Sequence, residues 1–222
     1  MEDNRSPEVR KEIGLNMISM AGSALRAIMR EDLDWSEALS EWQTVFHCAQ
    51  FILEHPETTE DEKRDARNNL RNSVYGMAHA FFELEEYQQA EEILEYAVDA
   101  QIADKRADVL LGICYVQTAD RNDMQAFLTK IRTTFILLRT VEQNPELELD
   151  AKIKHTAWMH LAFLYRNGRN LNILNSNDIE SAYRCITMAA TIPDLPDAVI
   201  DFTNAELHKY KKGLFGGYSY KE

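Results

Sequence analysis

Hydrophobic residues recur at helical spacing along most of the chain. They stand three or four positions apart from Glu8 to about Arg30, and again from Asp34 to about Glu54. This spacing predicts amphipathic helices, each with one apolar face. Thr59 and Glu62, three positions apart, predict a capping box at the start of the next helix. The same pattern predicts further helices at 60–84, 87–101, 105–118 and 122–142, on both sides of a loop at 168–177, and at about 197–211.

One pattern of apolar and small residues occurs twice, 34 positions apart. The first copy comprises Val74, Met77, Ala78, Phe81, Ala90, Leu94 and Ala97. The second comprises Asp108, Leu111, Gly112, Tyr115, Met124, Leu128 and Ile131. A third copy begins at His155 and comprises Trp158, Leu161, Ala162, Tyr165, Ala182, Ile186 and Ala189. In each copy a small residue allows two helices to approach closely, and an aromatic residue fills the space beside it.

A 34-residue unit with a small residue at position eight and an aromatic residue at position eleven resembles a tetratricopeptide (TPR) helical hairpin. The third copy, with its longer internal turn, also resembles a Sel1-like repeat. The resemblance implies an all-α protein, a right-handed α-solenoid of TPR-like hairpins with a C-terminal capping helix. We expect a single domain over 1–222. Its expected parts are a degenerate hairpin at 1–59, three repeats at 60–193, and a capping helix with an aromatic tail at 194–222.

Three segments depart from the regular repeat. Phe135–Leu138 is apolar all around one helical turn, so we expect it to pack on the terminal segments or on a second subunit. The loop 168–177 is rich in Asn, which tolerates left-handed backbone conformations. The tail contains Leu214, Phe215, Tyr218 and Tyr220. It is too apolar for a free end, and we expect it to fold back on the last hairpin or on the groove described below.

The formal net charge is −13, with only a small basic cluster at Lys209, Lys211 and Lys212. An acidic surface repels phosphate, so neither a nucleic acid nor a membrane is an expected partner. The N-terminus has no features of a secretory signal, and no stretch approaches the roughly 20 apolar residues of a membrane span. Three widely spaced cysteines in apolar helical patterns indicate reduced thiols. We therefore expect a cytoplasmic protein.

The candidates for chemistry are weak. His47 and Cys48 are neighbours in a helix and point about 100° apart, so they cannot share a metal unaided. Cys114 and His79 are the best imaginable nucleophile and base, but Cys114 lies beside the packed Gly112 position. The sequence contains no metal-binding or phosphate-binding motif. We expect no enzymatic activity, no cofactor and no metal.

The resemblance assigns certain helix positions to the concave surface of the repeats. They correspond to Asn72, Tyr75, His79, Phe82, Arg106, Val109, Ile113, Val116, Met159, Phe163 and Arg166. This set differs from the Lys/Arg/Asn clamp of chaperone-binding TPR proteins, because its centre is apolar. We expect a non-catalytic interaction module that binds a partner peptide or helix in this groove. The alternative is a structural homodimer whose groove is filled by its own termini.

Overall fold

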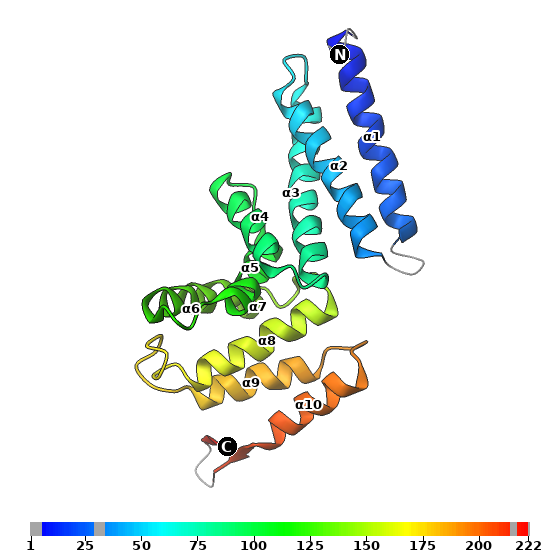
Figure 1. Cartoon of the computed structure of the whole chain (residues 1–222). Helices are drawn as coiled ribbons and strands as arrows, with labels where there is room; N and C mark the ends of the chain where they lie inside the picture. Colours follow the sequence, from blue (N-terminus) through cyan, green and yellow to red (C-terminus); the bar gives the residue numbers. More distant parts are fainter. Residues whose placement is uncertain (1–5, 29–33, 214–216, 222) are drawn as a thin grey trace. The chain divides into compact units, whose positions relative to one another are not determined.

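The computed structural model describes residues 6–28, 34–213 and 217–221, and it is predominantly helical (Figure 1). Contacts divide the chain into two compact units, residues 1–107 and 108–222. The division falls inside helix α5 (Lys105–Thr118), where the sequence predicted one continuous domain. Among the described helices, none is long and apolar enough to cross a membrane.

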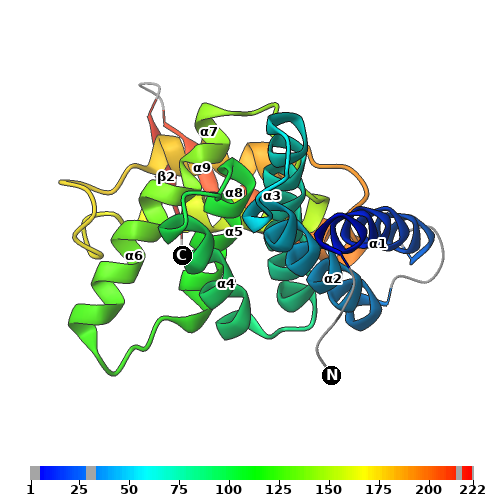
Figure 2. The ribbon, with the colours of Figure 1, turned by 90° about the horizontal axis from the view of Figure 1, so that it is seen from above.

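The first unit contains four helices that precede α5. They are α1 (Pro7–Ile28), α2 (Trp35–Glu54), α3 (Glu60–Glu83) and α4 (Tyr87–Asp99). In Figure 1 the chain runs along α1, returns along α2 and reverses again into α3. Helix α2 packs on both α1 and α3, and α4 packs on α3 (Figure 2).

Side chains and backbone turns set the ends of these helices. Asp34 accepts hydrogen bonds from the backbone amides of Ser36 and Glu37, which fixes the start of α2. Thr59 and Glu62 form the capping box that the sequence predicted for α3. After α3, Glu85 takes a left-handed conformation (φ 62°), and Glu86 N donates to Phe81 O at 2.8 Å. The chain therefore reverses tightly into α4 without a glycine.

The core of the first unit lies between α2, α3 and α4. Its centre is Val74, Met77 and Ala97, and the half-buried hydrophobic side chains around it include Leu39, Trp42, Phe46, Ile93 and Ile102. Ala78 and Ala90, both in the predicted repeat pattern, have no exposed surface. Small side chains at these positions suit a close approach of α3 and α4.

The second unit contains most of α5, five further helices and a short hairpin. These elements are α6 (Met124–Leu138), α7 (Thr140–Gln143), α8 (Ala151–Arg166), α9 (Ile179–Ala190), α10 (Asp197–His208), β1 (Tyr210–Lys212) and β2 (Tyr218–Tyr220). Helices α8 and α9 form the main pair, and α10 and β2 both pack on α9. Strands β1 and β2 pair antiparallel, with Tyr210 opposite Tyr220.

Several boundaries differ from the predictions. The helix predicted at 122–142 is divided into α6 and α7 at Arg139, whose ψ of −12° departs from the usual α-helical value by about 30°. Helix α10 ends at His208, and the residues predicted to continue it form β1. The loop at 168–177 is present, and Asn172 within it has a left-handed φ of 54°, as its composition indicated.

The apolar turn Phe135–Leu138 packs within the second unit. Leu138 has no exposed surface and Phe135 is buried, whereas Ile136 is 71% exposed. The Phe135 ring meets the Tyr165 ring of α8 edge-on, with centroids 5.1 Å apart. A Cβ at Gly112 of α5 would stand 3.0 Å from Leu138 Cδ2. The expectation of a packed turn is confirmed for these two residues, but their partners are α5 and α8, where we had expected the termini or a second subunit.

The C-terminal tail folds back on the last helices, as predicted. Tyr218 stacks on Tyr183 of α9 with ring centroids 4.0 Å apart. Tyr220 lies under the Arg166 guanidinium at 4.1 Å and donates a hydrogen bond to Glu206. Leu214 and Phe215, which belong to the same prediction, lie outside the described residues.

Replacing Gly112 with Leu should destabilise the protein by roughly 1–3 kcal/mol, because the new side chain would overlap Leu137 and Leu138. Urea unfolding measures this change. Gly14→Ala is the control, since its Cβ would be in ordinary contact with Ile52 at 3.7 Å. Equal stability of Gly112→Leu and the natural chain would contradict the close α5–α6 packing.

Docking of the tail should weaken in acid. Burial raises the pKa of Glu206, but hydrogen bonds from Lys209 and Arg166 outweigh burial, and the pKa is lowered from 4.5. A carboxyl group whose pKa is lower in the folded than in the unfolded state stabilises the fold fully at pH values above the unfolded pKa. This stabilisation is lost as the pH falls through the folded pKa. Between pH 7 and pH 3, the near-ultraviolet circular dichroism of the tyrosines should change before global unfolding. Glu206→Gln should remove this early step, whereas the exposed control Glu148→Gln should retain it.

Candidate functional site

A cavity of about 490 Å³ lies in the first unit between α1, α2 and α3. We call it the α1–α2–α3 cavity. It is lined by Ile18, Gly22, Leu25, Arg26, Trp35, Ala38, Trp42, Val45, Asn69, Asn72, Tyr75, Gly76, His79 and Arg106. Its volume falls within the range of pockets that bind small ligands or single large side chains.

Helical periodicity explains why these residues share one space. On α2 the lining positions are Trp35, Ala38, Trp42 and Val45, which are spaced by three or four residues and therefore lie on one face. The two indoles alternate with smaller side chains along this face. Gly22 on the facing α1 adds no side chain, so space remains between the helices.

Trp42 lies against the bare backbone of α3 at Gly76. A Cβ at position 76 would be only 2.2 Å from Trp42 Cε2 and 2.4 Å from Cδ2. Only glycine allows the indole this position, because no real Cβ tolerates such a contact. The wall of the cavity therefore depends on Gly76.

Four side chains form a continuous row along the cavity. Trp35 contacts His79 with ring centroids 4.8 Å apart, and His79 is 6.0 Å from Tyr75. The Arg106 guanidinium lies over the Tyr75 ring at 4.6 Å. Such cation–π and ring contacts hold each side chain in a defined position.

Arg106 is fixed by polar contacts as well. Its Nε and Nη2 donate to Asp104 Oδ2 at 2.9 and 2.7 Å, and Nη2 donates to Asn72 Oδ1 at 2.9 Å. Asp104 also accepts from the backbone amides of Arg106 and Ala107 at the start of α5. These bonds use Nε and Nη2 of the half-buried Arg106 side chain, and its Nη1 group takes no part in them.

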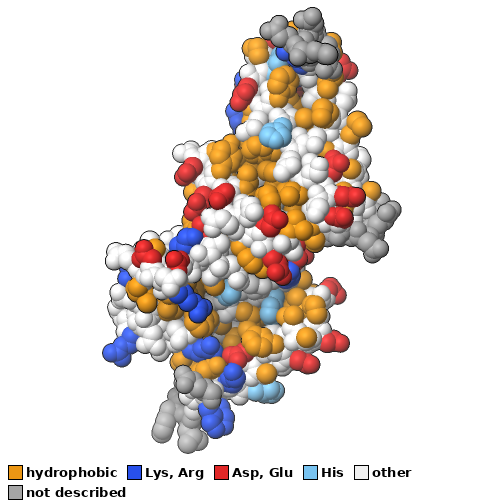
Figure 3. Space-filling view, in the orientation of Figure 1, with side chains coloured by type: hydrophobic (Ala, Val, Ile, Leu, Met, Phe, Trp, Pro, Cys, Tyr) orange, Lys and Arg blue, Asp and Glu red, His pale blue; other side chains and the backbone are white. Residues whose placement is uncertain are grey.

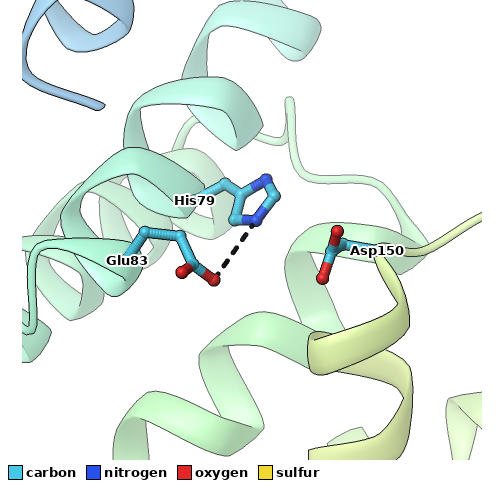
Figure 4. A group of neighbouring side chains, drawn as sticks. All are labelled: His79, Glu83 and Asp150. Carbon is cyan, nitrogen blue, oxygen red and sulfur yellow. Dashed lines mark ion pairs between the residues drawn. The ribbon is translucent and has the colours of Figure 1, made fainter. Parts of the chain in front are cut away.

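His79 has a second neighbour on its own helix. Its Nε2 is 3.7 Å from Glu83 Oε1, one turn further along α3, which is too long for a hydrogen bond (Figure 4). The contact is an ion pair only when the imidazole is protonated. His79 and Glu83 supply two ligand groups, whereas a structural zinc site uses four. We therefore interpret their contact as a charge interaction between the two side chains. Asp150, also drawn, belongs to the second unit and is not assigned to this site.

The second unit contains a smaller hollow of about 320 Å³. Its lining includes Met159 and Phe163 of α8 and Phe202 of α10. Arg166 also lines it, but the guanidinium is paired with Glu206 and covered by Tyr220 of the tail. Desolvation lowers the pKa of His160 in this hollow to about 4, so the imidazole is neutral at physiological pH.

The predicted groove residues therefore fall into three groups. Asn72, Tyr75, His79 and Arg106 line the α1–α2–α3 cavity, and Met159, Phe163 and Arg166 line the hollow of the second unit. Val109 and Ile113 have no exposed surface, Phe82 is buried against Tyr87, and Val116 is half-buried. Placing Val109, Ile113 and Phe82 on an open groove was wrong, because these side chains are core residues.

Sequence reasoning missed the tryptophans and the glycine that shape the cavity. The residues that it assigned to the groove do not include Trp35, Trp42, Gly76 or Arg26. One signal was available, since an isolated glycine inside a long helix usually has a packing reason. Nothing in the sequence, however, identified Trp42 as its partner.

Cys48 and Cys185 are poor nucleophiles. Burial, followed by the charge of Glu142, raises the pKa of the Cys185 thiol, and burial also raises that of Cys48. A thiol attacks only as the thiolate, which a raised pKa disfavours.

Comparison of the chain with protein-family models, with curated proteins and with solved structures finds no match. The interpretation of the site therefore depends on its own geometry.

Replacing Gly76 with Ala should displace Trp42 and destabilise the protein by roughly 1–3 kcal/mol, although the better helix propensity of Ala offsets part of this cost. Gly22→Ala is a matched control, because it lines the same cavity and its Cβ would meet only Arg26 Nη1, at 3.7 Å. Urea unfolding and tryptophan fluorescence measure the two effects. If both variants behave alike, the Trp42–Gly76 contact is not as described.

Proposed function

We propose that this chain is a TPR-like right-handed helical repeat protein that acts as a non-catalytic protein-interaction module. Its binding site is the α1–α2–α3 cavity, which accepts a partner peptide or helix. The observation that carries this proposal is the cavity itself, lined by residues of α1, α2 and α3 and by Arg106 of α5, with a row of ring and cation contacts along it.

The physical support is the cost of exposed apolar surface. Trp35 and Trp42 are half-buried, and covering their remaining exposed surface with a partner side chain lowers the free energy by roughly 25 cal/mol per Å² of apolar surface removed from water. The row Trp35, His79, Tyr75 and Arg106 is already ordered, so little conformational entropy is lost on binding.

The hollow of the second unit supports the alternative function, a structural homodimer whose groove is filled by its own termini. There, Tyr220 covers Arg166, which is a predicted groove residue, so the chain occupies part of that surface itself. Phe163 is 48% and Phe202 56% exposed, and Figure 3 shows hydrophobic side chains exposed among charged ones on the face it draws. A homodimer joined through such a surface would appear in light scattering as a constant doubled mass at all concentrations.

Panning a library of random linear peptides tests the proposed function. We expect peptides that bind the natural chain and lose at least tenfold in affinity to Gly22→Phe, whose ring would fill the cavity. Met20→Phe is the matched control, because Met20 is 71% exposed and is not part of the lining. Failure to enrich any peptide, or equal binding to Gly22→Phe, would contradict the proposal.

A further inference from the structure

We propose that the α1–α2–α3 cavity recognises a partner segment in which an aromatic side chain is flanked by acidic residues. This inference rests on the proposed function and adds the chemical class of the ligand. It depends on the charges and ring positions of the lining.

Arginines are the charged side chains of the described lining, although the chain is acidic. Arg26 and Arg106 belong to the lining, whereas no Asp or Glu is among the described lining residues. The net charge of the whole chain is −13. At physiological salt the charges of the remote surface are screened within about 8 Å. Asp104 lies 2.7 Å from Arg106 and offsets part of its charge, so Arg26 and the Nη1 edge of Arg106 are the groups that favour an acidic ligand.

The two arginines differ in how they bind. Arg106 is held by Asp104, Asn72 and the Tyr75 ring, so a carboxylate at Nη1 meets a preorganised donor. Arg26 is exposed, and its Nη2 donates only to Ser23 Oγ in the described hydrogen bonds. It supplies a flexible charge at the rim.

The apolar part of the cavity fits a ring. Trp35 and Trp42 are seven residues apart on α2, which places them on the order of 10 Å apart along the helix axis. Ala38 lies between them, so the two indoles flank a gap with a small floor. An inserted aromatic side chain can make offset or edge contacts with both walls, which aliphatic side chains cannot match.

The test uses three acetylated and amidated heptapeptides, so that side chains supply the only charges. The first has Asp and Glu around a central Trp, the second has Asn and Gln at the same positions, and the third has Lys. Binding is followed by titration calorimetry and by the indole ¹H–¹⁵N signals of Trp35 and Trp42. We expect the acidic peptide to bind about tenfold or more tightly than the neutral one, and the Lys peptide to bind most weakly.

Variants assign this preference to the arginines. Arg106→Gln should weaken the acidic peptide about tenfold and leave the neutral peptide nearly unchanged. Arg106→Lys, which keeps the charge and loses the planar fork, should fall between them. Arg26→Gln should cost about two- to fivefold, because exposed ion pairs are weak. Unfolding curves of each variant verify that the loss of the Asp104 contact has not unfolded the start of α5.

The outcomes separate this inference from the proposed function. Equal binding of acidic and neutral peptides, with loss in Gly22→Phe, would overturn the acidic preference and leave the peptide-binding function standing. Tighter binding of the Lys peptide would overturn it as well. A concentration-dependent dimer that Gly22→Phe abolishes would show that the occupant is a second copy of the chain. Absence of binding to every peptide, including those from the library, would overturn both.

Discussion

The contact between Trp42 and Gly76 connects the core of the first unit to its candidate site. The indole lies where a Cβ at position 76 would be 2.2 Å away, so α3 must present bare backbone at this point. The same side chain packs against the Val74 and Met77 core. A substitution that displaced it would therefore loosen the core and deform the cavity together, and the stability of α2 on α3 maintains the shape of the site.

The row of Trp35, His79, Tyr75 and Arg106 connects α2 to the start of α5 through ring and cation–π contacts. Asp34 caps α2 and places Trp35 at its first turn, where the indole meets His79. At the other end, Asp104 accepts hydrogen bonds both from the backbone amide of Arg106 at the start of α5 and from the Arg106 guanidinium. Two helix caps therefore fix the two ends of the row. Because folding already orders these side chains, less conformational entropy is lost when a ligand binds.

The sequence predicted what depends on neighbours along the chain. The capping box of Thr59 and Glu62, the helix starts and the close approach at Gly112 follow from local spacing and from the repeat pattern. The Trp42–Gly76 contact could not be predicted, because it depends on how far α2 and α3 are shifted along their axes relative to each other. The burial of Val109 and Ile113 has the same origin, since helical spacing defines faces but not what covers them. The strand pair β1–β2 was missed because Tyr210 was read as the end of a helix.

The two arginines that the sequence placed in one groove show how similar side chains take different roles. Arg166 is paired with Glu206 and stacked on Tyr220, so its charge holds the tail of its own chain. Arg106 is also paired, but its carboxylate partner Asp104 comes from its own helix start and approaches Nε and Nη2. The first arrangement uses the guanidinium for tertiary structure. The second orients it and leaves one edge for a ligand, which is why the cavity of the first unit carries the functional proposal and the hollow of the second unit does not.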